Sequence, residues 1–141
     1  MKTEIDINKY LGKWFEIARI PSNFEPDLTN VTAEYLKNDN GTIKVINSGY
    51  NFGDRVSIEG VAKITDKDDV LLLSFFKDIE TEYKILAITQ DYSYALVGGS
   101  DPDYLWMLGR DEIMPTNIYK WFQEVALEHA YNVEKLKITK G

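Results

Sequence analysis

The chain has 141 residues, a formal net charge of -7 and no cysteine, and its acidic residues are spread along its length. This length suits a single domain covering residues 1–141; the acidic balance argues against nucleic acid as a partner, and the lack of cysteine excludes disulfides and thiolate metal ligands. No apolar run approaches the roughly 20 residues of a membrane span, and the sequence as written has no signal peptide, so we expect a cytoplasmic protein; a periplasmic or outer-membrane-associated location is the alternative if a leader has been removed.

Eight short segments of strand-like character follow one another through the first four-fifths of the chain. Turn residues separate them at intervals of about 8–12 residues, which is typical of an all-β sandwich or barrel. Short turns between consecutive strands favour an up-and-down antiparallel barrel, because closure removes both exposed edges. The predicted strands are residues 12–20, 30–37, 42–51, 55–65, 70–76, 82–89, 94–99 and 103–110.

One amphipathic helix is predicted after Pro115. Thr116 is its expected N-cap, and Asn132 is the expected left-handed residue at its end. We expect the helix to pack outside the barrel and residues 135–139 to form a short final strand. The apolar stripe of the helix consists of Ile118, Trp121, Phe122, Val125 and Ala126.

Alternation of side chains along each strand predicts which of them face the barrel interior. Large rings share the inward set with small residues such as Ala33, Gly60, Ala62 and Ala87. This mixture is compatible with a cavity, and a solid core built from the same residues is the alternative. Glu16 has the inward parity of Trp14, so a buried carboxylate is expected, with Arg110 or a tyrosine as its partner.

Three short motifs occur in a fixed order along the chain. They are G-K-W at 12–14, T-Q-D-Y at 89–92 and G-R at 109–110. With eight strands and a late helix, this order resembles the lipocalin family, although the second motif has one residue more than the family's T-D-Y. The flanking runs NKYLG, EIARIP and YLWMLGR are most similar to the bacterial lipocalin and apolipoprotein D branch. The resemblance implies a structural role at the closed end of the barrel, with the arginine lying across the tryptophan, for Gly12, Trp14, Asp91, Tyr92 and Arg110.

The resemblance also implies a function and a set of contact residues. An eight-stranded antiparallel lipocalin barrel would bind a small hydrophobic ligand, such as a fatty acid, a lysophospholipid or a similar lipid, without chemistry, cofactor or metal. Asn47 and the tyrosine hydroxyls near the mouth of the barrel would select the polar head of the ligand. The predicted ligand-binding residues are Tyr35, Val45, Asn47, Ile58, Leu73, Phe75, Tyr83, Ile85, Val97, Tyr104 and Trp106.

Two other functions stay open at this point. The first is an enzyme acting on a lipid-like substrate inside the barrel, with Glu16 or His129 as acid or base. The second is a filled barrel that works through its outer surface, as a monomer or a homodimer. Bacterial members of the family often carry a lipid-anchoring cysteine and animal members carry disulfides, and this chain has neither.

Overall fold

The computed structural model describes residues 6–20, 29–51, 53–65, 70–76 and 79–138. Within these ranges, the side chains described are those of all residues except 29, 30, 51, 75, 76, 79 and 80. The predicted ligand contact Phe75 therefore lies outside the described side chains.

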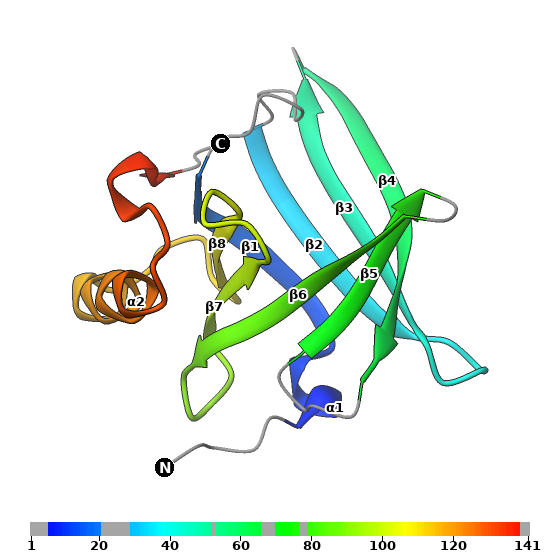
Figure 1. Cartoon of the computed structure of the whole chain (residues 1–141). Coiled ribbons are helices and arrows are strands. Elements are labelled where there is room, and N and C mark those ends of the chain that lie inside the picture. The colour runs from blue at the N-terminus through cyan, green and yellow to red at the C-terminus, as the bar shows by residue number, and fades with distance from the viewer. Residues whose placement is uncertain (1–5, 21–28, 52, 66–69, 77–78, 139–141) are drawn as a thin grey trace.

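Eight antiparallel strands form a closed barrel, as the sequence predicts (Figure 1). Each strand pairs with the next along the chain, and β1 closes the barrel by pairing with both β2 and β8. A ninth strand, β9 (Lys137–Ile138), pairs with the last two residues of β1, after the part of β1 that pairs with β2. The barrel strands are β1 (Gly12–Arg19), β2 (Thr29–Lys37), β3 (Ile43–Asn51), β4 (Asp54–Ile64), β5 (Val70–Phe76), β6 (Ile79–Ile88), β7 (Tyr94–Gly99) and β8 (Leu105–Gly109).

A short helix, α1 (Ile7–Tyr10), covers one end of the barrel, which we call the closed end (Figure 1). The carboxylate of Asp6 accepts a hydrogen bond from the backbone of Asn8 at 3.0 Å and so caps this helix. The sequence gives no helical signal here, because one helical turn is too short to show a periodicity. The opposite end, where β3 and β7 end, we call the mouth.

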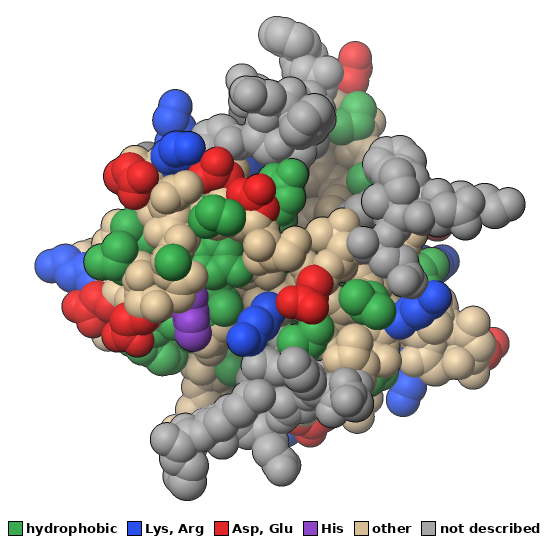
Figure 2. Space-filling view, viewed as in Figure 1, with side chains coloured by type: hydrophobic (Ala, Val, Ile, Leu, Met, Phe, Trp, Pro, Cys, Tyr) green, Lys and Arg blue, Asp and Glu red, His purple; other side chains and the backbone are tan. Residues whose placement is uncertain are grey.

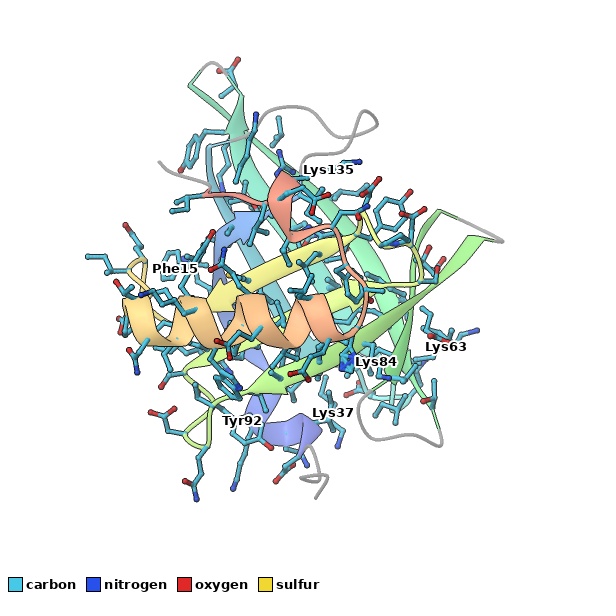
Figure 3. The ribbon with its side chains drawn as sticks, turned by 60° about the vertical axis from the view of Figure 1, so that its left-hand side comes forward. Phe15, Lys37, Lys63, Lys84, Tyr92 and Lys135 are labelled. Carbon is cyan, nitrogen blue, oxygen red and sulfur yellow. The ribbon has the colours of Figure 1, made fainter. Side chains whose placement is uncertain are left out.

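The helix α2 (Thr116–Glu128) lies across the outside of the barrel wall, as expected (Figure 3). Phe122 and Ala126 are fully buried there, in an outer cluster with side chains of β1, β7 and β8 such as Leu96 and Met107. Trp121 departs from the predicted stripe, because it remains 40% exposed. Lys63 of β4 points away from the wall, as its predicted parity requires (Figure 3).

The predictions for the two ends of α2 are wrong. Thr116 is the first helical residue, and the N-cap position is Pro115, which makes no side-chain cap. The helix ends at Glu128, and the left-handed residue that follows it is Ala130, with a φ of 65°, whereas Asn132 has a φ of -84°. Contacts outside the helix decide this end, because the backbone N–H of Asn132 donates to the carbonyl of Pro102 at 3.0 Å. A 3-10 turn, η1 (Val133–Lys135), then replaces the first part of the predicted final strand.

Four strand pairings of the described sheet contain a register shift that alternation alone does not predict, and the shifts between β1 and β8 and between β6 and β7 change which side chains face inward. In β6 the shift lies between Ile85 and Ala87, and Ala87 packs in the outer cluster instead of facing inward. Ile88 takes the next inward position, where it packs against the interior cluster. The prediction that Ala87 faces the interior is therefore wrong, since the extra residue of a β-bulge reverses the alternation.

Candidate functional site

The closed end is sealed by a cation stacked on a ring. Trp14 is fully buried, and the guanidinium carbon of Arg110 lies 3.7 Å from the centre of its ring. Arg110 also ties together segments that are distant in the sequence, because its N–H groups donate to five backbone carbonyls. These belong to Lys9, Tyr10, Leu11, Lys13 and Tyr92, at 2.8–3.2 Å.

Gly12 is required by this seal for two reasons. Its φ is 107°, which an L side chain rarely adopts, and a Cβ atom there would lie 3.3 Å from Nη1 of Arg110. The glycine therefore lets the chain pass close beneath the guanidinium before β1 begins.

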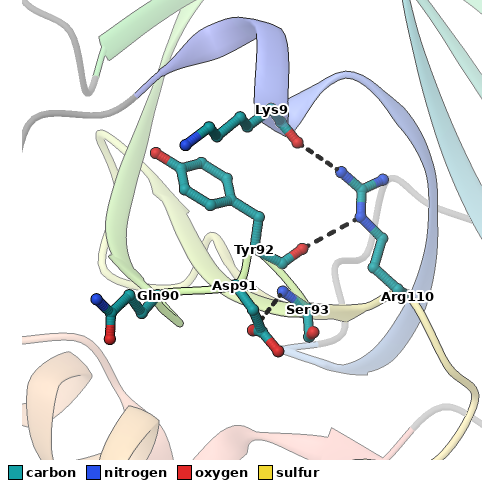
Figure 4. A pocket seen from close by; sticks show the side chains of 6 residues that line it. All are labelled: Lys9, Gln90, Asp91, Tyr92, Ser93 and Arg110. Carbon is teal, nitrogen blue, oxygen red and sulfur yellow. Dashed lines mark hydrogen bonds between the residues drawn. The ribbon is translucent and has the colours of Figure 1, made fainter.

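The turn between β6 and β7 forms the other side of the seal. The carboxylate of Asp91 accepts hydrogen bonds from the hydroxyl of Thr89 and the backbone of Ser93, and these hold its pKa below the usual range. Tyr92 adopts a left-handed φ of 59°, and its hydroxyl accepts from the backbone of Asp6 at 2.9 Å. A surface hollow of about 440 Å³ lies here (Figure 4), lined by Lys9, Gln90, Asp91, Tyr92, Ser93 and Arg110.

Three tyrosines form a polar layer just inside the seal. The hydroxyl of Tyr83 lies 2.9 Å from that of Tyr10 and 2.8 Å from that of Tyr35. All three residues are buried, and burial raises the pKa of each hydroxyl, so the layer stays neutral at physiological pH. The hydroxyls satisfy one another, as buried tyrosines require.

Aromatic rings continue from this layer towards the mouth. Trp106 stacks on Tyr83 with the ring centres 6.3 Å apart, and Tyr104 stacks on Trp106 at 6.4 Å. Trp106 and Tyr104 are only partly buried. The turn beside them is held by the C-terminal segment, because Asn132 and Lys135 (Figure 3) both bond the carboxylate of Asp103.

The predicted ligand contacts fall into two groups in the structure. The first group is at least partly exposed and consists of Asn47, Ile58, Leu73, Tyr104 and Trp106. Within it, Trp106 and Leu73 pack against the interior cluster, and Ile58 pairs across the sheet with Asn47. The second group lies deep in the interior cluster. Val45 and Val97 have no exposed surface, and the other three residues of the group are at most 7% exposed. This group consists of Tyr35, Val45, Tyr83, Ile85 and Val97.

The inward-facing Glu16 has a different neighbour from the one expected. Arg110 bonds backbone carbonyls over Trp14, and Glu16 makes an ion pair with Arg19, at 3.9 Å between Oε1 and Nε. Both residues are 8% exposed. Simple alternation from Trp14 places Arg19 outside the barrel, and a register shift in β1 brings it inside. The sequence carries no signal that locates such a shift.

The other groups considered for chemistry are apart from this interior. His129 is exposed at the end of α2. Among the residues that the structure describes, no three His, Asp or Glu side chains gather where they could hold a metal ion. On the face seen in Figure 2, acidic and basic side chains are interspersed over the described surface. None of the described helices is long and apolar enough to span a membrane.

Comparison with known proteins places this geometry in a wider group. A family model described as a lipocalin-like domain matches residues 5–141. The outer membrane lipoprotein Blc of Vibrio cholerae is 35% identical over 139 residues, covering 95% of this chain and 81% of its own. Apolipoprotein D of Bos taurus is 32% identical over 150 residues, covering 99% and 78%. The solved structure of insecticyanin from the tobacco hornworm Manduca sexta has the same fold, with a TM-score of 0.78 at 21% identity over 99% of this chain and 82% of its own.

Proposed function

Because the chain belongs to the lipocalin family, whose members bind small hydrophobic ligands, we propose that it binds and carries or stores such a ligand inside its barrel, without catalysing a reaction. A fatty acid, a lysophospholipid or a similar lipid suits an eight-stranded barrel, whose interior is wide enough for one small ligand.

The observation that carries this proposal is the exposure of apolar side chains on the inner face of β4. Val56 and Ile58 have the inward parity of Gly60 and Ala62, which are buried, yet they remain 39% and 42% exposed. A solid core would cover such side chains. Their exposure near the mouth supports an interior that solvent, and therefore a ligand, can enter from that end.

We propose that the ligand occupies the mouth half of the barrel. The rings of Trp106 and Tyr104 form one wall of this half, and Ile58 and Leu73 supply apolar surface elsewhere. Burying a ligand against them would contribute about 25 cal/mol per Å² of apolar area, less the cost of ordering the ligand. Val45 and Val97 would pack beneath the residues that contact the ligand and would not contact it themselves, because they have no exposed surface.

The amide of Asn47 is a polar group in this half. It makes no side-chain hydrogen bond to any residue that the structure describes, and it is only partly buried. An uncharged polar part of the ligand could bond it. Of the predicted contact tyrosines, Tyr35 and Tyr83 have their hydroxyls bonded within the tyrosine layer, whereas Tyr104 lies nearer the mouth.

Location and assembly are part of the same proposal. The bacterial relatives are named as outer membrane lipoproteins, which supports a periplasmic or outer-membrane-associated location over the cytoplasmic one. The ligand would be taken up by a monomer or a homodimer.

Extraction of the purified protein with organic solvent, followed by mass spectrometry, tests the proposal. We expect a lipid to be recovered in near-stoichiometric amount, or to bind stoichiometrically when added to delipidated protein. A protein that yields none and takes up none would instead be a filled barrel acting through its surface.

Tryptophan fluorescence locates the ligand. The chain offers a matched pair of variants, Trp106→Phe in the interior and Trp121→Phe on the outer helix. A bound fatty acid should change the emission of wild type and of Trp121→Phe, and most of this change should be lost in Trp106→Phe. An unaltered response in Trp106→Phe would place the ligand elsewhere.

A further inference from the structure

A β-bulge in β1 places Arg19 on the inner face of the barrel, where Glu16 already lies. The pairing of β1 with β8 shifts between Glu16 and Ala18, so that Glu16 lies opposite Leu108 and Arg19 lies opposite Trp106. Leu108 belongs to the interior cluster and Trp106 packs against it. Paired residues of neighbouring strands point to the same side of a sheet, and both charges therefore face inward.

This pair of charged side chains is buried among apolar ones. Glu16 and Arg19 are each 8% exposed, and their neighbours on the inner face are Trp14, Trp106 and Leu108. Burying an ion pair costs desolvation free energy that a pair of apolar side chains would not cost. Good hydrogen-bond geometry between the two charged groups is needed to offset this cost. The distance of 3.9 Å between Nε and Oε1 exceeds that of a hydrogen bond. Between these two atoms the contact is therefore an ion pair and not a direct hydrogen bond.

The chemistry of an arginine in this position suits one class of ligand group. A guanidinium presents five N–H donors in a planar fork, which matches the two oxygens of a carboxylate. Lys137 is the cross-strand neighbour of Arg19 on β9 and adds a second positive charge next to it. Glu16 sets one carboxylate against Arg19, at 3.9 Å.

We propose that Arg19 binds the carboxylate of a single-chain fatty acid inside the barrel, and that Glu16 holds and partly screens Arg19 when no ligand is bound. This inference rests on the proposed function and specifies its ligand class. The carboxylate would lie beside Trp106, above the tyrosine layer, and the acyl chain would run across the mouth half towards Ile58. Electrostatics then selects acids over neutral lipids of the same length.

The test compares palmitic acid with methyl palmitate, whose head cannot form the ion pair. Affinities are measured at pH 8 by tryptophan fluorescence for delipidated wild type, Arg19→Met, Glu16→Gln and the double variant. Lys44→Met is the matched control, because Lys44 is a lysine on the outer face of β3, paired with the exposed Leu36 and Val61.

We expect wild type and Lys44→Met to bind the acid roughly 10-fold or more tightly than the ester, as a hydrogen bond to a charged group implies. Arg19→Met should remove this preference, whereas Glu16→Gln should increase it by removing a competing carboxylate. The double variant lacks both charges and should bind acid and ester equally, which covers the case in which Arg19→Met alone fails to fold around an uncompensated Glu16.

The outcomes separate this inference from the proposed function. If neither compound binds wild type or is recovered from it, the ligand-binding function itself fails. If both bind but wild type shows no preference for the acid, or if Arg19→Met and Glu16→Gln change the preference in the same direction, the ligand-binding function stands and the role of Arg19 is refuted.

Discussion

Replacing Arg110 by Met should destabilise the barrel by about 3 kcal/mol. The cation–π contact with Trp14, at 3.7 Å and partly shielded from water, contributes about 1 kcal/mol. Of the five carbonyls that Arg110 bonds, those of Lys9 and Lys13 are exposed and can bind water instead. The carbonyl of Tyr10 keeps the hydrogen bond from the Trp14 indole at 2.8 Å. The two remaining carbonyls are partly buried and lose their donor, at about 1 kcal/mol each.

Urea unfolding followed by far-ultraviolet circular dichroism measures this loss. Arg110→Lys should retain the charge above the ring but not the planar fork, so its loss of unfolding free energy should be about half as large. Lys37→Met removes an exposed positive charge from β2 and serves as the control, with an expected change within about 0.5 kcal/mol. A loss below about 1 kcal/mol for Arg110→Met would show that the carbonyls are solvated in the folded protein and that the seal is held by apolar packing.

Three further changes test other parts of the structure. Tyr83→Phe removes the central hydroxyl of the tyrosine layer and should lower the free energy of unfolding by about 1–2 kcal/mol, more than Tyr10→Phe does, as urea titration would show. Gly98→Ala should cost about 2 kcal/mol, because the new Cβ would lie 2.5 Å from the hydroxyl of Tyr131, and Tyr131→Ala in the same chain should remove most of the added cost. The pKa of Asp103 is lowered by its hydrogen bond from Asn132 and by Lys135. The carboxylate therefore stabilises the fold fully above the ordinary pKa of 3.8, and this stabilisation is lost as pH falls through the lower folded-state pKa. The melting temperature of Asp103→Asn should accordingly fall less below pH 4 than that of wild type.

The strands were predictable because their signals are local. The turn at residues 38–42 shows this, since Gly41 adopts a φ of 89° and the backbone N–H of Asn38 donates to the backbone carbonyl of Thr42. Turn chemistry of this kind needs no knowledge of distant residues. β5 and β7 begin and end where the sequence places them, and the other barrel strands differ from the prediction by at most three residues at either end.

The ends of α2 and the interior pairings were less predictable, because distant residues determine them. The chain leaves α2 through Ala130 where the hydroxyl of Tyr131 donates to the carbonyl of Gly99, a contact between residues 32 apart in the sequence. In the same way, Tyr10 belongs to the tyrosine layer only because α1 folds beneath the barrel. No periodicity in either segment records these contacts.

The bulges in β1 and β6 connect the outer helix with the interior of the barrel. In β1 the successive residues Ile17 and Ala18 both pack in the outer cluster with Phe122 and Ala126 of α2. Strand β6 does the same with Leu86 and Ala87, which also pack against that cluster. Each strand thereby presents two neighbouring apolar side chains to the helix. Because the extra residue reverses the alternation that follows, covering the wall with a helix and turning Arg19 inward are consequences of the same insertion in β1. A variant that restores regular alternation in β1 would have to give up one of the two.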